Sequence, residues 1–285
     1  MNDNKEVAVS PSRPLIGCAV RDLPEPFYQD DFVTIYNADC REILSHLAPV
    51  DLTVTSPPYD SLREYQGFDF DFETTARELF NTTKQGGAVV WVVGDATINE
   101  SETGTSFRQA LFFKQIGFNL HDTMIFHRVS QPRQHNRYEQ AFEYMFVFTH
   151  GKPKTTNIKR IVCKQSGQPQ SNSSREDGKD FLEKLNYRTR PTKKDINIWQ
   201  YNAGFGHYTG DKIAYEHPAI FPEKLAADHI LSWSNEGDTI LDPFAGSGTT
   251  LKMAKKLGRK AIGIEISKDY CQIAIERLKQ QALRF

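Results

Sequence analysis

The segment 242–250, with the sequence Asp-Pro-Phe-Ala-Gly-Ser-Gly-Thr-Thr, constrains the fold of this chain more than any other. Residues 238–241 before it have the apolar character of a short buried strand, and residues 251–257 after it have helical spacing. A strand, a tight turn and a helix in this order form a ligand crevice in α/β folds. Because Gly246 and Gly248 carry no Cβ atom, the backbone there can turn sharply and approach a ligand closely. The segment therefore predicts an α/β fold with a binding site at this turn.

The rest of the chain alternates strand patterns with helix patterns. Short apolar or alternating runs predict strands at 32–36, 50–55, 88–94, 122–127, 143–149 and 260–264. Helical spacing predicts helices at 42–47, 73–84, 106–116, 224–233 and 268–282. The first two strands and the helix between them form a βαβ unit, so those strands should run parallel. We therefore predict a Rossmann-like α/β fold with a mostly parallel central sheet, after an irregular, proline-containing arm at 1–31.

The composition excludes several classes of protein. The 285 residues suffice for one large α/β domain, and no apolar run approaches the ~18 residues of a membrane span. The polar start of the chain lacks the apolar segment of a signal peptide, so we expect a soluble, cytoplasmic protein. The four cysteines lie far apart and form no CxxC pair, which predicts neither a metal site nor a disulfide framework.

Charge is distributed unevenly along a chain whose net charge is only −1. Between residues 151 and 195, twelve Lys and Arg stand against five Asp and Glu, a local net charge of +7. This stretch has no helix or strand pattern, and it is either a solvated loop or a surface that binds a polyanion. The candidate phosphate contacts are Lys152, Lys154, Lys159, Arg160, Lys164, Arg175, Arg188, Arg190, Lys193 and Lys194.

A second candidate site follows the predicted strand at 50–55. Ser56-Pro57-Pro58-Tyr59 lies at the carboxyl end of that strand, where α/β folds place their ligand sites. Two prolines stiffen the backbone and bring no N–H groups of their own. The Ser56 hydroxyl and the Pro57 carbonyl are then available to accept protons from an exocyclic amine, while Tyr59 can stack on a flat base. The alternative is a Pro-Pro strand end with a chance tyrosine.

Glu265 ends the predicted strand at 260–264, about twenty residues beyond the glycine turn. An acidic residue in this position is placed to bond ribose hydroxyls, which favours a nucleoside cofactor over a plain strand–helix turn. The glycine spacing differs from GxGxxG, and no basic residue stands where a pyrophosphate would need one. This weakens the case for a dinucleotide.

Three segments, 55–59, 217–222 and 242–250, resemble motifs of the amino-group DNA methyltransferases that use S-adenosyl-L-methionine. Their order, with the target-amine motif first and the cofactor motif last, is similar to the β group of that family, a circular permutation of the methyltransferase fold. The resemblance covers roughly residues 32–282 apart from the basic stretch. It implies a catalytic half at 32–150, a target-recognition insertion at 151–210 and a cofactor-binding half at 211–285.

The resemblance also implies roles for single residues. Ser56, Pro57, Pro58 and Tyr59 would form the catalytic loop. Asp39 would lie near the adenine amine of the cofactor, and Glu265 would bond the cofactor's ribose. The implied cofactor-binding set is Asp39, Asp242, Phe244, Gly246, Ser247, Gly248, Thr249, Thr250, Glu265, Phe221, Pro222 and Lys224.

The identity of the methylated amine depends on residue 56. Enzymes of this family that act on adenine N6 usually carry Asp or Asn there, so Ser56 favours cytosine N4, with adenine N6 as the alternative. Methylation at cytosine C5 needs an attacking thiolate, and no cysteine neighbours Pro57 or Pro58. We predict in-line attack by the amine of a flipped cytosine on the sulfonium methyl, with double-stranded DNA as partner. A homodimer and a separate cognate restriction endonuclease are further implied partners. A catalytically silent nucleic-acid-binding protein, and a methyltransferase of RNA or small molecules, are the competing readings.

Overall fold

The computed structural model describes residues 23–58, 70–128, 136–163, 190–202, 208–217, 220 and 222–280. The strands in chain order are β1 (Tyr28–Gln29), β2 (Val33–Asn37), β3 (Val50–Thr55), β4 (Thr83–Val93), β5 (Thr97–Ile98), β6 (Ser101–Glu102), β7 (Asn119–Arg128), β8 (Phe142–Thr149), β9 (Arg160–Val162), β10 (Thr192–Lys194), β11 (Ile198–Tyr201), β12 (Thr239–Asp242) and β13 (Lys260–Glu265). The helices are α1 (Cys40–Leu44), α2 (Phe72–Thr82), α3 (Thr105–Gln115), α4 (Glu223–Trp233), α5 (Thr249–Lys256) and α6 (Lys268–Gln280), with a 3₁₀ helix, η2, at Lys212–Glu216.

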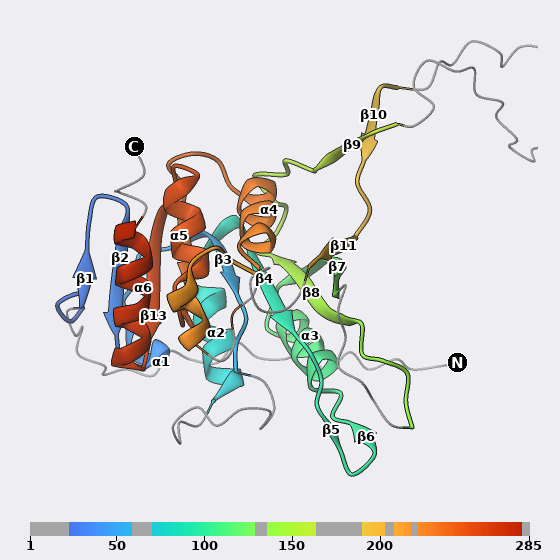
Figure 1. The fold of residues 1–285 in the computed structure, drawn as a ribbon, viewed down its shortest axis with the longest axis horizontal. Helices are drawn as coiled ribbons and strands as arrows, with labels where there is room; N and C mark the ends of the chain where they lie inside the picture. The colour runs from blue at the N-terminus through green and yellow to red at the C-terminus, as the bar shows by residue number, and fades with distance from the viewer. Residues whose placement is uncertain are drawn as a thin grey trace, which may run out of the picture.

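A nine-stranded sheet in the order β1-β2-β13-β12-β3-β4-β8-β7-β11 forms the centre of the molecule (Figure 1). Neighbouring strands run parallel from β2 to β4 and between β7 and β11, whereas β1 and β8 pair antiparallel with their neighbours. The predicted α/β fold with a mostly parallel sheet is thereby confirmed. Strands β2 and β3 are parallel, as expected, but β13 and β12 from the other end of the chain lie between them. The last strands of the chain therefore lie beside the first.

Helices cover both faces of the sheet, so each face has its own hydrophobic core. Side chains of α4, α5 and α6 pack on one face, and those of α1, α2 and α3 pack on the other. Strand β4 shows the division, because Val90 and Val92 point into the first core while Trp91 and Val93 point into the second. A strand buried on both faces needs the continuous apolar run that the sequence has here.

Several predicted boundaries were wrong. Helix α2 ends at Thr82 and not at Lys84, and strand β4 begins at Thr83 and not at residue 88, so Gly86 and Gly87 lie within the strand and do not end the helix. A Cβ atom on Gly87 would lie 2.9 Å from the Asp51 carbonyl oxygen, so the close approach of β3 excludes a larger residue. The arm predicted to be irregular up to residue 31 includes β1, whose Tyr28 pairs with Ile35. Asp30 accepts the main-chain N–H of Val33 at 2.8 Å and closes the turn between β1 and β2.

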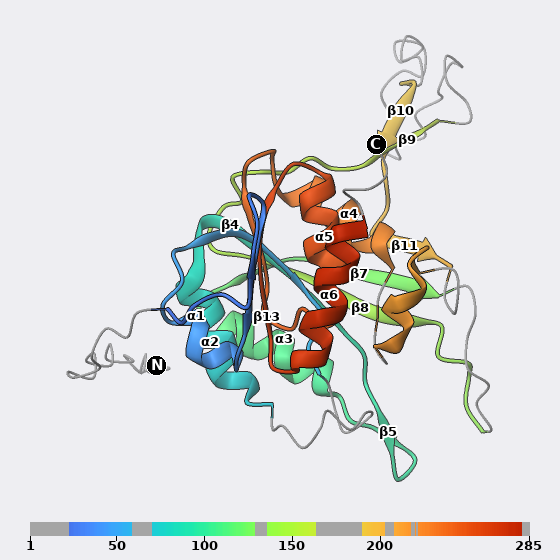
Figure 2. The same ribbon diagram turned by 60° about the vertical axis from the view of Figure 1, so that its left-hand side comes forward.

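We call the end of the sheet at which β3, β12, β13 and β4 terminate the carboxyl end, and the end at which they begin the amino end. The chain after β8 runs along the amino end, where His150 accepts the N–H of Gly86 at 2.7 Å and Asn157 donates to Ser232 at 2.8 Å. From there β9 and β10 form an antiparallel ribbon that extends away from the body (Figures 1 and 2). The predicted insertion 151–210 is therefore not wholly separate from the sheet, since β11 within it pairs with β7. Within the described ranges, no helix is long and apolar enough to cross a membrane.

Candidate active site

The two segments that the sequence singles out lie side by side at the carboxyl end of the sheet. Strand β3, which leads into Ser56, is the parallel neighbour of β12, which leads into the glycine turn. The Thr55 hydroxyl donates a 2.7 Å hydrogen bond to Asp242 Oδ1, and the Thr250 hydroxyl donates to the Val54 carbonyl at 3.1 Å. These two bonds join the start of the Ser56 segment to both sides of the glycine turn.

Asp242 is the central acceptor of this junction. Its side chain is buried, and it also accepts the main-chain N–H of Phe244 at 3.1 Å. Burial raises the pKa of Asp242 to about 6, although the hydrogen bonds from the Thr55 hydroxyl and the Phe244 N–H oppose the rise. A buried carboxyl group with several donors holds the backbone around it in one arrangement. Asp242 thus fixes the relative position of the two loops.

The glycine turn needs its glycines for two different reasons. Gly246 and Gly248 have φ angles of 49° and 76°, in the left-handed region that other residues rarely adopt. A Cβ atom on Gly248 would lie 2.8 Å from the Cβ of Ala274 on α6. The first of these constraints concerns the backbone, and the second concerns packing against the helix behind the turn.

Glu265, at the end of β13, holds the turn on its other side. Its carboxylate accepts the Gly246 N–H at 2.8 Å and the Ser267 N–H at 2.9 Å. Burial raises the pKa of Glu265, the charge of Asp242 adds to the rise, and the two N–H groups lower it. The carboxylate is therefore beside the turn where the sequence predicts it, and its role toward a ribose stays a prediction.

The third predicted segment also reaches the turn. A Cβ atom on Gly246 would lie 2.8 Å from His217 Nε2, so the glycine makes room for the imidazole. The His217 ring packs edge-on against Tyr270, with ring centroids 4.3 Å apart. Pro222 caps the start of α4, and the Lys224 ammonium pairs with Asp228 at 3.2 Å. Phe221 lies outside the described residues, as does Tyr59 of the catalytic loop.

Phe244 and Asp39 are the remaining predicted cofactor residues. The Phe244 ring packs edge-on against Phe70, with centroids 5.2 Å apart, next to Trp91. Asp39 caps α1 and pairs with Arg41 at 2.5 Å; these contacts lower its pKa. In this structure the Asp39 carboxylate therefore binds its neighbour on α1, and its predicted place at an adenine amine stays a prediction.

Comparison with known proteins identifies the group to which this arrangement belongs. A family model described as DNA methylase matches residues 50–276, most of the chain. The chain belongs to the N6/N4 DNA methylase family. The orphan methyltransferase M.BamHII of Bacillus amyloliquefaciens is 56% identical over 240 residues, which cover 81% of this methylase and 89% of that protein.

Solved structures agree on the fold of the methylase. The PvuII DNA methyltransferase (cytosine-N4-specific) superposes with a TM-score of 0.66 at 19% identity, over 88% of both chains. The M1.HpyAVI–SAM complex superposes with a TM-score of 0.57 at 23% identity, over 86% of this chain and 99% of that one. With the family match, the methylase is an S-adenosylmethionine-dependent DNA amino-methyltransferase.

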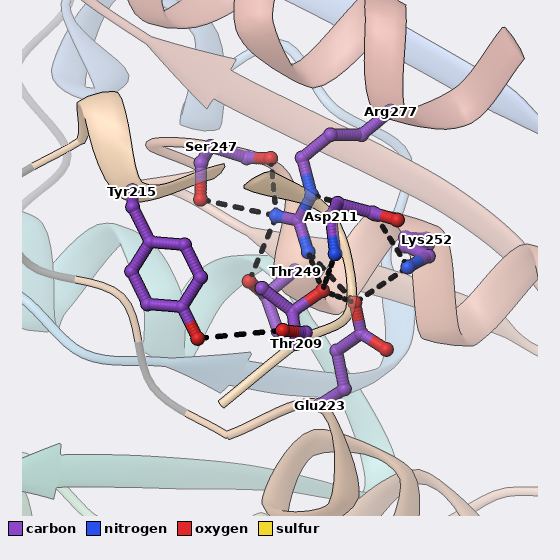
Figure 3. Close-up of polar contacts among 8 residues, drawn as sticks. All are labelled: Thr209, Asp211, Tyr215, Glu223, Ser247, Thr249, Lys252 and Arg277. Atoms are coloured by element: carbon purple, nitrogen blue, oxygen red, sulfur yellow. Dashed lines mark hydrogen bonds and ion pairs between the residues drawn. The ribbon is translucent and has the colours of Figure 1, made fainter. Parts of the chain in front are cut away.

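The sequence did not reveal a buried ionic cluster behind the glycine turn of the methylase (Figure 3). Arg277 on α6 and Lys252 on α5 face Asp211 and Glu223 there. The available signal was a charged residue on an apolar helix face, since Arg277 shares its side of α6 with the buried Ala274 and Leu278.

The structure does not bring the predicted DNA-binding residues to the catalytic loop. The described ones lie along the amino end of the sheet or on the β9–β10 ribbon, whereas Ser56 is at the carboxyl end. They are Lys152, Lys154, Lys159, Arg160, Arg190, Lys193 and Lys194. Lys159 pairs with Asp228 at 3.2 Å, and its ammonium lies 5.2 Å from the Trp199 ring centroid. Lys164, Arg175 and Arg188 lie outside the described residues. The role of this set in DNA binding stays a prediction.

Proposed function

We propose that the methylase transfers a methyl group to the exocyclic N4 amine of a flipped cytosine in double-stranded DNA. The observation that carries this proposal is the junction between β3 and β12. The Thr55–Asp242 hydrogen bond of 2.7 Å sets Ser56, the next residue, beside the turn predicted to hold the methyl donor. Serine at position 56 favours cytosine, because members of the family that act on adenine N6 usually carry Asp or Asn there.

The residues present fit S-adenosylmethionine. The backbone of the turn is open to a ligand because Gly246 and Gly248 carry no side chain. Glu265 supplies the carboxylate for ribose hydroxyls, Phe244 an aromatic surface, and Asp39 an acceptor for an adenine amine once it leaves Arg41. When bound, the cofactor supplies an electrophilic methyl group on a sulfonium.

The chain's own contribution to the chemistry is orientation. The amine lone pair of cytosine is conjugated with the ring, and accepting its two protons favours the pyramidal, nucleophilic form. Ser56 Oγ and the Pro57 carbonyl are the proposed acceptors, and the buried Pro57 keeps the loop rigid. A serine hydroxyl is a weak base, so it positions the amine while the released proton leaves to water.

Nucleoside analysis of DNA methylated by the purified protein tests the proposal. We expect N4-methylcytosine after hydrolysis of plasmid DNA incubated with S-adenosylmethionine. N6-methyladenine as the sole product would reject cytosine and leave the adenine alternative. No labelled methyl in either nucleoside would reject the catalytic assignment itself.

Replacing Ser56 with Ala tests the role of the hydroxyl. We expect turnover to fall about a hundredfold, in the range seen when one positioned polar group is removed from a reaction centre, with little change in cofactor affinity. Single-turnover rates with a labelled methyl group, together with cofactor titrations, give the two quantities. Equal turnover in the variant and the wild type would remove Ser56 from the mechanism.

Two partners and a location belong to the same proposal. A homodimer is tested by light scattering of the purified protein, and a cognate restriction endonuclease by protection of methylated DNA against cleavage. The relative M.BamHII comes from a bacterium, where DNA lies in the cytoplasm, so we propose the cytoplasm as the location of the methylase.

A further inference from the structure

Two cationic and two anionic side chains meet behind the glycine turn, away from the bonds of Asp242 and Glu265. Lys252 contacts Asp211 at 2.6 Å and Glu223 at 2.5 Å, and Arg277 contacts the same two residues at 3.2 and 2.9 Å. The Arg277 side chain is fully buried, with an exposed fraction of 0%. The four charges balance, with Lys252 on α5, Arg277 on α6 and both carboxylates between residues 209 and 223.

Arg277 joins the glycine turn to the segment 209–223. Its Nη1 donates to the Ser247 carbonyl at 2.7 Å and to the Thr249 hydroxyl at 3.1 Å (Figure 3). Its Nε and Nη2 donate to Asp211 and Glu223, which lie on the other segment. A guanidinium is a planar fork with fixed donor directions, so one side chain sets the position of both segments.

The segment 209–223 is held at its two ends by the same cluster. The Thr209 hydroxyl donates to Glu223, and the Tyr215 hydroxyl donates to the Thr209 carbonyl at 3.3 Å. Burial raises the pKa of Asp211, but hydrogen bonds and attraction from Lys252 and Arg277 outweigh it and leave that pKa below its ordinary value. Asp211 therefore stays charged. His217 lies between Asp211 and Glu223 in the sequence, and its imidazole is beside Gly246.

Stability alone is a poor reason for such a cluster. Removing four charges from water costs about as much as their attraction returns, and apolar residues of the same volume often stabilise a protein better. A hydrogen-bonded ionic cluster does, however, restrict the segments that carry it to one relative position. The arrangement is therefore suited to fixing geometry at the turn.

We propose that Arg277, Lys252, Asp211 and Glu223 are positioning residues that seat residues 209–217 against the glycine turn and so place His217 in the wall around the amino-acid end of S-adenosylmethionine. The proposal rests on the proposed function in one respect, because it takes His217 to lie at that end of the cofactor. It goes beyond it in assigning a role to four residues that the motifs do not include.

Binding of two cofactor fragments to the full-length protein without DNA tests the proposal. S-adenosylhomocysteine has the amino-acid end, whereas 5′-methylthioadenosine has the nucleoside and lacks the amino-acid end. We expect Lys252→Met to weaken S-adenosylhomocysteine binding about tenfold, as is common for networks that touch no ligand, and to leave methylthioadenosine binding within about twofold. Isothermal titration calorimetry gives both dissociation constants.

Lys255→Met is the matched control. Lys255 lies on the same helix and pairs with Asp30 at 2.5 Å, remote from the segment 209–223. The same substitution there should leave both dissociation constants unchanged. Asp211→Asn, which keeps the side-chain shape, should show the same selective loss as Lys252→Met and serves if the latter does not fold.

Equal weakening of the two ligands in Lys252→Met and Asp211→Asn would overturn the proposal, because it indicates a general loss of structure. Unchanged binding of both ligands would overturn it as well. These outcomes are separate from the proposed function, since neither ligand titration depends on which base is methylated. Methylation of adenine would leave the selective loss intact.

Discussion

The two ends of the central sheet differ in how their polar groups are used. At the carboxyl end, buried polar groups bond one another across segments that are far apart in the sequence, such as Thr55 with Asp242 and Gly246 with Glu265. At the amino end, the basic residues are mostly exposed, and Arg160 bonds Thr192 of the neighbouring ribbon strand. One end is a junction of hydrogen-bonded loops, and the other is a charged surface.

The difference shows what each kind of sequence signal can locate. A motif fixes backbone geometry, and a strand–turn–helix unit carries its site with it to the carboxyl end of a parallel sheet. A surplus of charge says that a surface is basic, but it does not say on which side of the fold the surface lies. Here the direction of β11, parallel to β7, decides that the ribbon leaves from the amino end.

The largest loss of stability should come from adding a side chain to Gly248, at the carboxyl end of the sheet. Gly248→Ala places a Cβ atom 2.8 Å from Ala274 at a φ of 76°. Left-handed backbone and overpacking together should lower the free energy of unfolding by about 3 kcal/mol. Urea denaturation followed by circular dichroism measures the change.

Gly237→Ala is the matched control at the amino end. Gly237 has a similar φ of 82°, but nothing lies within 4 Å of the added Cβ atom. The expected loss is about 1 kcal/mol, due to backbone strain alone. Equal losses in the two variants would show that packing against α6 is not what requires Gly248.

A smaller, pH-dependent effect is expected from Asp242. Its pKa is about 6 in the folded protein, above the ordinary 3.8, so the folded state holds this proton more tightly than the unfolded chain. The Asp242 carboxyl stabilises the folded state below pH 3.8, and this stabilisation is lost as the pH rises through about 6. Between about pH 4.5 and about pH 7.5, the loss amounts to about 2 kcal/mol.

Asp242→Asn removes this titration. The difference in unfolding free energy between the variant and the wild type should therefore shift by about 2 kcal/mol in favour of the variant over that pH range. The buried His229, whose pKa falls to about 3, opposes Asp242 in this range, but it is common to both proteins and cancels in the difference. A pH-independent difference would mean that Asp242 does not titrate above its ordinary range.

Local features of the structure were largely predictable from the sequence, and long-range ones were not. The glycine turn between β12 and α5 is specified by adjacent residues, as is the buried run of β4. The position of β12 and β13 between β2 and β3 has no local signal, and it was not predicted. The partners of Arg277 lie tens of residues away, so its cluster depends on packing that no helical pattern encodes.

The smallest effect should come from the ribbon, and it tests whether the basic surface binds the same DNA as the loop at Ser56. Lys193→Gln with Lys194→Gln removes two exposed charges at the amino end. If both lysines contact phosphates, DNA affinity at low salt should fall about tenfold, and the slope of log affinity against log salt should decrease by about 2. Fluorescence anisotropy over a salt series measures both.

Lys114→Gln with Lys256→Gln is the control, because these lysines are exposed on α3 and α5 and lie outside the basic segment. A two-charge loss there should leave the salt slope unchanged. An unchanged slope in the ribbon variant as well would show that Lys193 and Lys194 make no phosphate contacts. A reduced salt slope in the ribbon variant would mean that the duplex, or a second stretch of it, reaches the amino end of the sheet. Lys193 and Lys194 lie toward that end, and Ser56 lies at the carboxyl end.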